Sequence, residues 1–281
     1  MAEAVKVPVD GVAVTAIGVA VIRARESERA DRLYDDPLAK DFVAAARAGF
    51  DEERWTRLEA IADQFYEGRT IGVRLVDDRF REAIAAGCRQ IVLLGAGLDT
   101  RAFRMDLPED VHVFEIDLPE LFAFKEPVLT AAAATPTCHR SVVIADLRED
   151  WRNPLLATGF QPNVPTYWVD EGSLGYLNQD WNQRVVLTLT ELSAPGSRFG
   201  AGRLIVDDNA PQYRDLRRFV AGDSATEPIA APRPADFDVE QWLDEIGWDT
   251  EFRSWNDMIA SLPRPADPLD PRIGSIAAVR R

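Results

Sequence analysis

QIVLLGAGLDTRAFR, residues 90–104, is the stretch that decides the fold. It begins with an apolar run, Ile91 to Leu94, that is typical of a strand buried on both faces. Gly95 and Gly97 follow directly. Because glycine adopts positive φ easily and lets a ligand approach the backbone, a strand that runs into Gly-Ala-Gly ahead of a helix indicates a nucleotide-like ligand at the turn.

The residues after the glycines separate two classes of ligand. The dinucleotide fingerprint GxGxxG needs a third glycine for close packing and access to the pyrophosphate, but this sequence has Thr100 there. Asp99 also places a carboxylate near the start of the helix, where a diphosphate would lie. A cofactor without phosphates fits better. S-adenosylmethionine (SAM) is such a cofactor, since it carries sulfonium and ammonium cations and a single carboxylate.

Three further strands are expected to end at acidic residues. These are Asp117 after a strand at 111–116, Asp146 after a strand at 141–145, and Glu171 after a strand at 166–169. Asp117 comes about 20 positions past the glycines, where a carboxylate can accept both ribose hydroxyls, which SAM keeps free. Since the carboxyl ends of parallel strands meet at one edge of an open sheet, we expect Gly95 and the three acidic residues to line one cleft.

Four ordered blocks of the sequence resemble the leucine carboxyl methyltransferase-like class I SAM-dependent methyltransferases, a family with many bacterial members. The blocks are LLGAGLDTRAFR (93–104), FEIDLPELFAFK (114–125), ADLREDW (145–151) and PTYWVDEGSLGYL (165–177), and the segment RARES…YDDPLAKDF (23–42) also fits. The resemblance implies a Rossmann-like α/β fold, with a seven-stranded, mostly parallel sheet, helices on both faces and an N-terminal helical cover.

The same resemblance implies roles for individual residues. The residues expected to bind the cofactor are Arg69, Gly95, Gly97, Asp117, Leu118, Asp146, Leu147 and Glu171. Arg69 would bind the cofactor carboxylate through two parallel hydrogen bonds. Asp146 would accept from the adenine amino group while the Leu147 backbone N–H donates to the ring, and Glu171 would face the ammonium and sulfonium. On the acceptor side, Arg25 would hold an anionic acceptor and Tyr176 would hydrogen-bond its carboxyl group.

Each of these residues also has a plainer interpretation. Arg69 is equally consistent with a surface arginine, and Asp146 with the N-cap of a following turn. Tyr176 fits a ring packed in the core. Arg25 fits the solvated end of a packing helix at 12–30.

The block after the fourth strand departs from the family. Asp170, Ser173 and Gly175 stand where apolar side chains are usual, which predicts a roomier and more polar acceptor side. A carboxylate acceptor needs no base at neutral pH, whereas a hydroxyl acceptor usually does. His112 and His139 fall within or just before strands rather than at carboxyl ends, so both are expected to be structural. Asp170 and Glu171 therefore remain as candidate bases.

Composition limits the possible partners and the expected location of the protein. The 281 residues carry a net charge of −15 with scattered basic residues, which argues against nucleic acid and anionic membrane surfaces as partners. The only cysteines, Cys88 and Cys138, suggest buried thiols and neither a disulfide framework nor a metal site. The apolar run 12–22 is too short to span a bilayer. These features predict a cytoplasmic protein.

Domain organisation follows from the spacing of the blocks. We expect residues 1–68 to form the helical cover, with Gly68 interrupting the helical pattern, and residues 69–281 to form the methyltransferase domain. A loop-rich insertion is expected near 221–236. A fifth strand is predicted at 203–207. Two further strands, at 250–253 and 274–279, are expected to complete the sheet.

The sequence therefore favours an O-methyltransferase that moves a methyl group from SAM to a carboxylate or hydroxyl of a small molecule. An in-line attack by the acceptor oxygen on the methyl group is the implied reaction. One alternative is an NAD-dependent oxidoreductase, which would want the missing third glycine and a Tyr-Lys or His constellation. The other alternative is a SAM-binding protein without catalytic activity.

Overall fold

A seven-stranded sheet with the strand order β3-β2-β1-β4-β5-β7-β6 forms the centre of the molecule in the computed structural model, which describes residues 6–203, 211–221 and 237–281. The strands are β1 (Gln90–Leu94), β2 (His112–Asp117), β3 (His139–Ile144), β4 (Thr166–Asp170), β5 (Arg198–Arg203), β6 (Trp248–Ser254) and β7 (Gly274–Arg280). The first five run parallel, and β7 inserts antiparallel between β5 and β6. The predicted seven-stranded, mostly parallel sheet is confirmed.

The strand order reverses between β1 and β4. From β1 the chain moves outward to β2 and β3, and it then returns to pair β4 with the other side of β1. Helices that leave two neighbouring strands in opposite directions open a crevice above their carboxyl ends. The fold therefore places the ends of β1 and β4 at a natural ligand-binding position.

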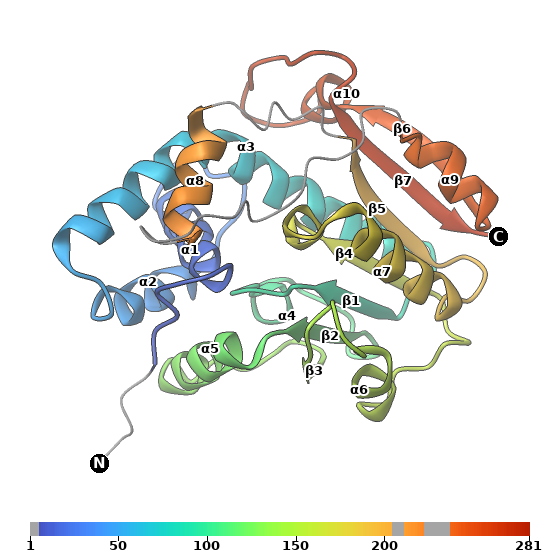
Figure 1. Cartoon of the computed structure of the whole chain (residues 1–281), viewed down its shortest axis with the longest axis horizontal. Helices are drawn as coiled ribbons and strands as arrows, with labels where there is room; N and C mark the ends of the chain where they lie inside the picture. Colours follow the sequence, from blue (N-terminus) through green and yellow to red (C-terminus); the bar gives the residue numbers. More distant parts are fainter. Residues whose placement is uncertain (1–5, 204–210, 222–236) are drawn as a thin grey trace.

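Helices cover both faces of the sheet (Figure 1). They are α1 (Ala13–Ser27), α2 (Ala39–Arg47), α3 (Glu52–Ala85), α4 (Arg101–Arg104), α5 (Pro119–Ala131), α6 (Arg152–Ala157), α7 (Gln179–Glu191), α8 (Pro211–Ala221), α9 (Val239–Glu245) and α10 (Trp255–Ile259), with a 3₁₀ turn, η1, at Ser173–Tyr176. Val92 and Leu94 pack in the cluster that includes α6, α7 and α9, whereas Ile91 and Leu93 pack with α3. Alternate residues of β1 thus serve opposite faces, as expected of a central strand.

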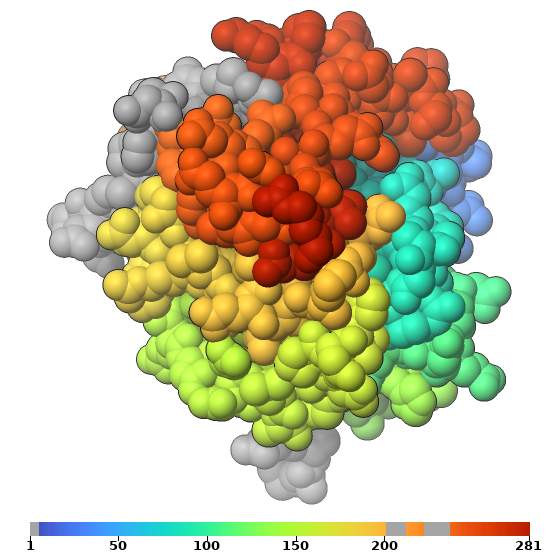
Figure 2. Space-filling model, turned by 90° about the vertical axis from the view of Figure 1, so that its right-hand side faces the viewer, coloured from blue at the N-terminus to red at the C-terminus, as the bar shows by residue number. Residues whose placement is uncertain are grey.

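The N-terminal helices form a separate layer beside the carboxyl ends of the strands. Helices α1, α2 and α8 and the first half of α3 group on one side of the sheet, away from β6 and the C terminus (Figure 1). Their apolar side chains share one cluster with α5. The face shown in Figure 2 is built instead by α6, α7, α9 and the C-terminal strand, which follow one another across its surface. The cover predicted for the N-terminal region is present.

Helix α3 is continuous, so the predicted interruption at Gly68 is wrong. The helix runs for 34 residues from Glu52, and the side chain of the N-cap residue Asp51 accepts a hydrogen bond from the Arg54 N–H. Gly68 is exposed, and a Cβ there would meet nothing within 4 Å. Glycine costs a helix only about 1 kcal/mol, which packing along the rest of α3 offsets. The expected boundary at residue 68 therefore falls inside one helix that belongs to both the cover and the sheet.

The fifth strand begins earlier than predicted. It spans Arg198–Arg203, where the pairing with β7 fixes its register, and its Gly-Ala-Gly segment carries little sequence signal for a strand. Residues 204–207 of the predicted strand lie outside the described residues, as does all but the first residue of the predicted insertion near 221–236. Within the described ranges, no helix has the length and apolar character needed to cross a bilayer.

Two leucines of α7 provide a test of the packing. Leu189 is fully buried against the sheet, whereas Leu187 on the same helix is 43% exposed. We expect Leu189→Ala to lower the free energy of unfolding by about 2–5 kcal/mol, because it leaves a cavity in a packed core. Leu187→Ala is the matched control and should change it by about 0.5 kcal/mol or less. Urea denaturation measures both, and equal losses would contradict the packing described.

Candidate active site

The turn after β1 requires glycine at two positions. Gly95 and Gly97 have φ values of +66° and +54°, in the left-handed region that side chains disfavour. A Cβ on Gly95 would overlap the Cβ of Ser173, and a Cβ on Gly97 would lie 3.5 Å from Ala16 of α1. The turn is therefore in close contact with η1 on one side and with the cover on the other.

Asp117, at the end of the neighbouring strand β2, binds the backbone of the glycine turn. Its two carboxylate oxygens accept hydrogen bonds from the backbone N–H groups of Gly97, at 2.6 Å, and Leu118, at 2.7 Å. Burial raises the pKa of the Asp117 carboxyl above its ordinary value, although these two N–H donors oppose the rise. The side chain remains partly accessible, so its oxygens have capacity to accept further hydrogen bonds from a ligand.

Glu171 lies directly after β4, beside the end of β1, as predicted. Its backbone carbonyl accepts a 2.7 Å hydrogen bond from Arg69 Nη1, and Gly172 next to it has a φ of +119°. A Cβ on Gly172 would come within 3.1 Å of Arg69 Nη2, so the glycine makes room for the guanidinium. Among the described residues no carboxylate is ion-paired with Arg69. Its charge is consequently available for an anionic ligand.

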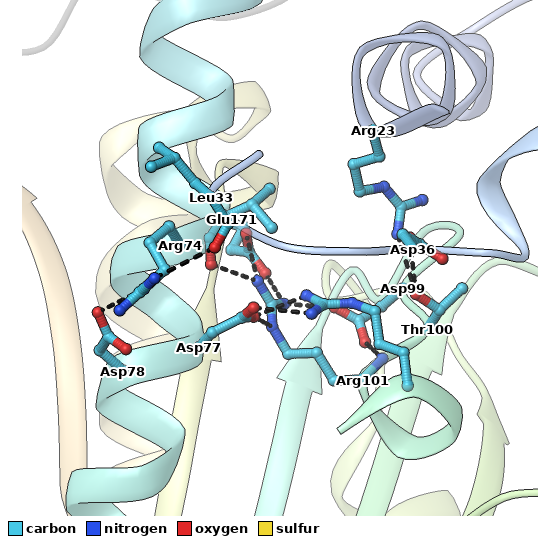
Figure 3. A network of polar contacts seen from close by, with 12 residues as sticks. Arg23, Leu33, Asp36, Arg74, Asp77, Asp78, Asp99, Thr100, Arg101 and Glu171 are labelled. Atoms are coloured by element: carbon cyan, nitrogen blue, oxygen red, sulfur yellow. Dashed lines mark hydrogen bonds and ion pairs between the residues drawn. The ribbon is translucent and has the colours of Figure 1, made fainter. Parts of the chain in front are cut away.

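Arg101 is the centre of the polar network at this edge, and sequence reasoning did not single it out (Figure 3). Its guanidinium is 2% exposed and forms ion pairs with Asp77, Asp99 and Glu171. Burial alone would lower its pKa, but the three carboxylates raise the pKa well above the ordinary value. A buried arginine must be neutralised, but no local pattern in the sequence marks Arg101 as buried.

Asp146 reaches the same edge but is already paired. The backbone of Ala145 donates to the Asp117 carbonyl at 3.0 Å, which places Asp146 beside the end of β2. Its carboxylate accepts hydrogen bonds from the backbone and the side chain of Arg148, which lower its pKa. Leu147 follows and packs against the cluster of the α7 face. The structure thus brings all four predicted strand-end residues to one edge of the sheet.

The departures from the family pattern at Asp170 and Ser173 are linked. The Ser173 hydroxyl donates to Asp170 Oδ1 at 2.5 Å and lies 2.7 Å from the Leu94 carbonyl. The same Oδ1 accepts from the backbone N–H groups of Gly172 and Leu174. Asp170 therefore stabilises the turn into η1, and its engaged oxygen makes it a poor candidate for a general base.

The two residues expected on the acceptor side lie in different surroundings. Tyr176 is the last residue of η1 and is partly buried, near Glu171 in the chain. Arg25 forms ion pairs with Glu59 and Asp63 of α3 on the outer side of the cover. An anionic acceptor would have to compete with these two carboxylates for the Arg25 guanidinium.

Arg23, two residues before Arg25 on α1, faces the glycine turn. It is 4% exposed, and its guanidinium donates to Asp36 at 2.8 Å and to the Leu98 carbonyl at 2.6 Å. The Thr100 hydroxyl also donates to Asp36, at 2.8 Å. These bonds attach the cover to the glycine turn. Two residues along a helix rotate by about 200°, which explains why Arg23 faces inward and Arg25 outward.

The histidines lie at the opposite end of the strands. His112 and His139 begin β2 and β3, with ring centroids 5.8 Å apart, and His112 Nε2 is 2.8 Å from Ser141 Oγ. Burial and the neighbouring His139 lower the pKa of His112. In the described ranges, no group of three or more His, Cys, Asp or Glu side chains is arranged to hold a metal ion.

Known proteins resemble the chain along most of its length. A family model described as leucine carboxyl methyltransferase matches residues 16–190. A protein of Parafrankia sp. (strain EAN1pec), named as an S-adenosyl-L-methionine-dependent methyltransferase, is 47% identical, covering 96% of this chain and 87% of that protein. A Streptomyces coelicolor A3(2) protein named in the same way is 38% identical, with 96% of each covered. A solved methyltransferase structure from Thermobifida fusca YX has a similar fold, with a TM-score of 0.55 at 20% identity, over 97% of this chain and 95% of that chain.

The contact between Gly95 and Ser173 gives a second test. We expect Gly95→Ala to lower the free energy of unfolding by about 1–3 kcal/mol, through the positive φ and the overlap with Ser173. Combining it with Ser173→Gly should cost less than the sum of the two single changes, because the overlap is then relieved. Gly175→Ala is the control, since a Cβ there meets nothing within 4 Å. Strict additivity would contradict the contact.

The histidine pair gives a test that depends on pH. Because the pKa of folded His112 is below the ordinary 6.5, the unfolded chain binds more protons in the window just under pH 6.5. Stability is therefore present above that pH and is lost as the pH falls through the folded-state pKa. We expect the free energy of unfolding of the unmodified protein to drop more between pH 7.5 and 5.5 than that of His112→Gln. Equal drops in urea denaturation would show that His112 is not desolvated.

Proposed function

The chain belongs to the leucine carboxyl methyltransferase family and is a SAM-dependent methyltransferase, and on this premise we propose that it methylates an oxygen atom of a small molecule. The acceptor oxygen belongs to a carboxylate or a hydroxyl group. It attacks the methyl group of SAM in line with the sulfonium, which leaves as a neutral thioether. The observation that carries the proposal is the meeting of Arg69, the glycine turn, Asp117 and Glu171 at one edge of the sheet.

Each of these groups suits one part of SAM. Asp117 has a carboxylate at the end of β2 for the two ribose hydroxyls, and its raised pKa reflects a buried position that costs stability and is typical of functional sites. Arg69 has a guanidinium for the SAM carboxylate that is ion-paired with no carboxylate in the described part of the chain, and Glu171 has a carboxylate for the cationic groups. Asp146 and the Leu147 N–H would hold the adenine. The Asp146 carboxylate would then accept hydrogen bonds from both the adenine amino group and Arg148.

The state of the acidic residues favours an acceptor that is already ionised. Asp170 stabilises the turn into η1, and Glu171 is paired with Arg101, so both carboxylates that could act as bases are engaged. The histidines lie at the amino ends of the strands. A carboxylate acceptor needs no base, whereas an alcohol would. Tyr176 would donate a hydrogen bond to that carboxylate.

Catalysis on such a site depends on positioning and on exclusion of water. The reaction brings together an anion and a sulfonium cation, so charge is lost in the transition state and a less polar surrounding favours it. The contacts of Arg23 with Leu98 and Asp36 hold α1 against the glycine turn and close the site from that side. Holding oxygen and methyl in line can contribute about 7–11 kcal/mol to lowering the barrier.

The proposed role of Asp117 is tested with S-adenosylhomocysteine (SAH), the product of methyl transfer. Asp117→Ala should weaken SAH binding by about 100-fold, because hydrogen bonds to a charged group are worth about 1.5–3 kcal/mol each. Asp110→Ala is a matched control, since that aspartate lies just before β2 and pairs with Arg89 at the surface. Isothermal titration calorimetry measures both affinities. Unchanged SAH affinity in Asp117→Ala would refute the ribose assignment.

The chemistry itself is tested with a panel of acceptors. Purified protein is incubated with methyl-labelled SAM and separate sets of carboxylic acids, phenols, alcohols, amines and thiols. Transfer of label to a carboxylic acid or a hydroxyl compound, with base-labile product in the case of an ester, is the expected result. Transfer confined to amines, thiols or carbon acceptors would contradict the O-methyltransferase proposal.

A further inference from the structure

We propose that Arg101 is a positioning residue for the cofactor, which acts by fixing the side chain of Glu171. The inference rests on the proposed function, in which Glu171 faces the cationic groups of SAM. Arg101 Nη1 and Nη2 both bond the Glu171 carboxylate, with Nη2 at 3.2 Å from Oε2. A guanidinium that grips both oxygens of a carboxylate fixes its plane as well as its distance. Glu171 therefore presents its remaining acceptor positions in one orientation.

The guanidinium is itself held in place by α3. Asp77 accepts from Arg101 Nε at 2.7 Å, and the Val73 carbonyl lies 3.3 Å from Nη2. Arg69, which bonds the Glu171 backbone carbonyl at 2.7 Å, belongs to the same helix about two turns earlier. Helix α3 thus holds Glu171 at two points, directly through Arg69 and indirectly through Asp77 and Arg101. The second of these connections is visible in Figure 3.

The three carboxylates of the cluster differ in how far a ligand could reach them. Three carboxylates, Asp77, Asp99 and Glu171, are bonded by two guanidiniums, Arg101 and Arg104. Asp77 takes two hydrogen bonds from Arg104 in addition to the one from Arg101. The Nη1 and Nη2 groups of Arg101 donate to Asp99 and Glu171. The side chain of Asp77 is 2% exposed, that of Asp99 10% and that of Glu171 29%, so Glu171 is the most accessible carboxylate of the cluster.

A cationic cofactor group is the partner that this arrangement fits. A partly exposed carboxylate at the end of a buried cluster attracts a cation of compact size, because its charge is poorly screened by water on the buried side. The SAM ammonium has that charge and size. Arg101 consequently fixes the orientation of the Glu171 carboxylate and partly offsets its negative charge, without contacting the cofactor.

A double-mutant cycle on SAH affinity tests this role. Glu171→Gln alone should weaken SAH binding by about 10-fold or more, as expected for loss of an ionic hydrogen bond. Arg101→Lys alone should weaken it by about 5- to 10-fold, since lysine cannot form the planar two-bond grip. If Arg101 acts through Glu171, adding Arg101→Lys to Glu171→Gln should weaken SAH binding by no more than about 2-fold further.

A matched control separates positioning from loss of stability. Arg140 also forms a buried two-bond pair, with Glu115, but near the amino end of the edge strand β3. Arg140→Lys should lower the melting temperature while leaving SAH affinity within about 2-fold, since it lies outside the cofactor edge. Should Arg101→Lys fail to fold by circular dichroism, Asp77→Asn takes its place in the cycle, because it removes the ion pair that holds the guanidinium against α3.

The outcomes distinguish this inference from the proposed function. A wild-type affinity in Glu171→Gln would overturn the assignment of Glu171 to the cofactor and the inference with it. A weakened Glu171→Gln beside an unchanged Arg101→Lys would overturn the inference alone. Multiplication of the two single effects in the double variant would also overturn it, because Arg101 would then act independently of Glu171.

Discussion

A buried guanidinium needs carboxylates around it, and this constraint organises the edge of the sheet where we propose that the cofactor binds. Arg101 is almost fully buried directly after the glycine turn, and its partners come from α3, the turn itself and the end of β4. Removing one partner from such a cluster leaves a charge uncompensated, which typically costs about 3–5 kcal/mol. The ion pairs therefore tie three distant parts of the sequence into one fixed arrangement around the turn.

The parallel sheet supplies the second half of the arrangement. Its strand order brings the ends of β1, β2 and β4 side by side, so Gly95, Asp117 and Glu171 meet although they are far apart in the sequence. The sheet fixes the backbone at these points, and the cluster around Arg101 fixes the side chain of Glu171. The cover adds a third element, because Arg23 attaches α1 to the same turn through the Leu98 carbonyl. The sheet, the ion pairs of Arg101 and the contact with α1 thus all fix the glycine turn after β1.

The sequence was sufficient for β1 to β4 and for the residues at their ends, because buried strands and glycine turns leave a local pattern, but it placed β5 too late in the chain. The interactions between elements were harder to predict. Arg101 and Arg23 each bond groups that lie more than ten residues away, and no local pattern distinguishes them from surface arginines such as Arg25. The continuous helix at Gly68 was missed because tertiary packing outweighs the local propensity of one residue. The link between Asp170 and Ser173 likewise becomes visible only when the turn is folded.

The central claim is that the ends of β1 to β4 bind SAM in one orientation, and a crystal structure of the SAH complex tests it most directly. The account predicts the ribose hydroxyls on Asp117, the carboxylate on Arg69, the ammonium on Glu171 and the adenine beside Asp146. The Glu171 carboxylate should remain bonded to Arg101 in that complex. SAH bound away from this edge, or bound here with its carboxylate and adenine exchanged, would contradict the account.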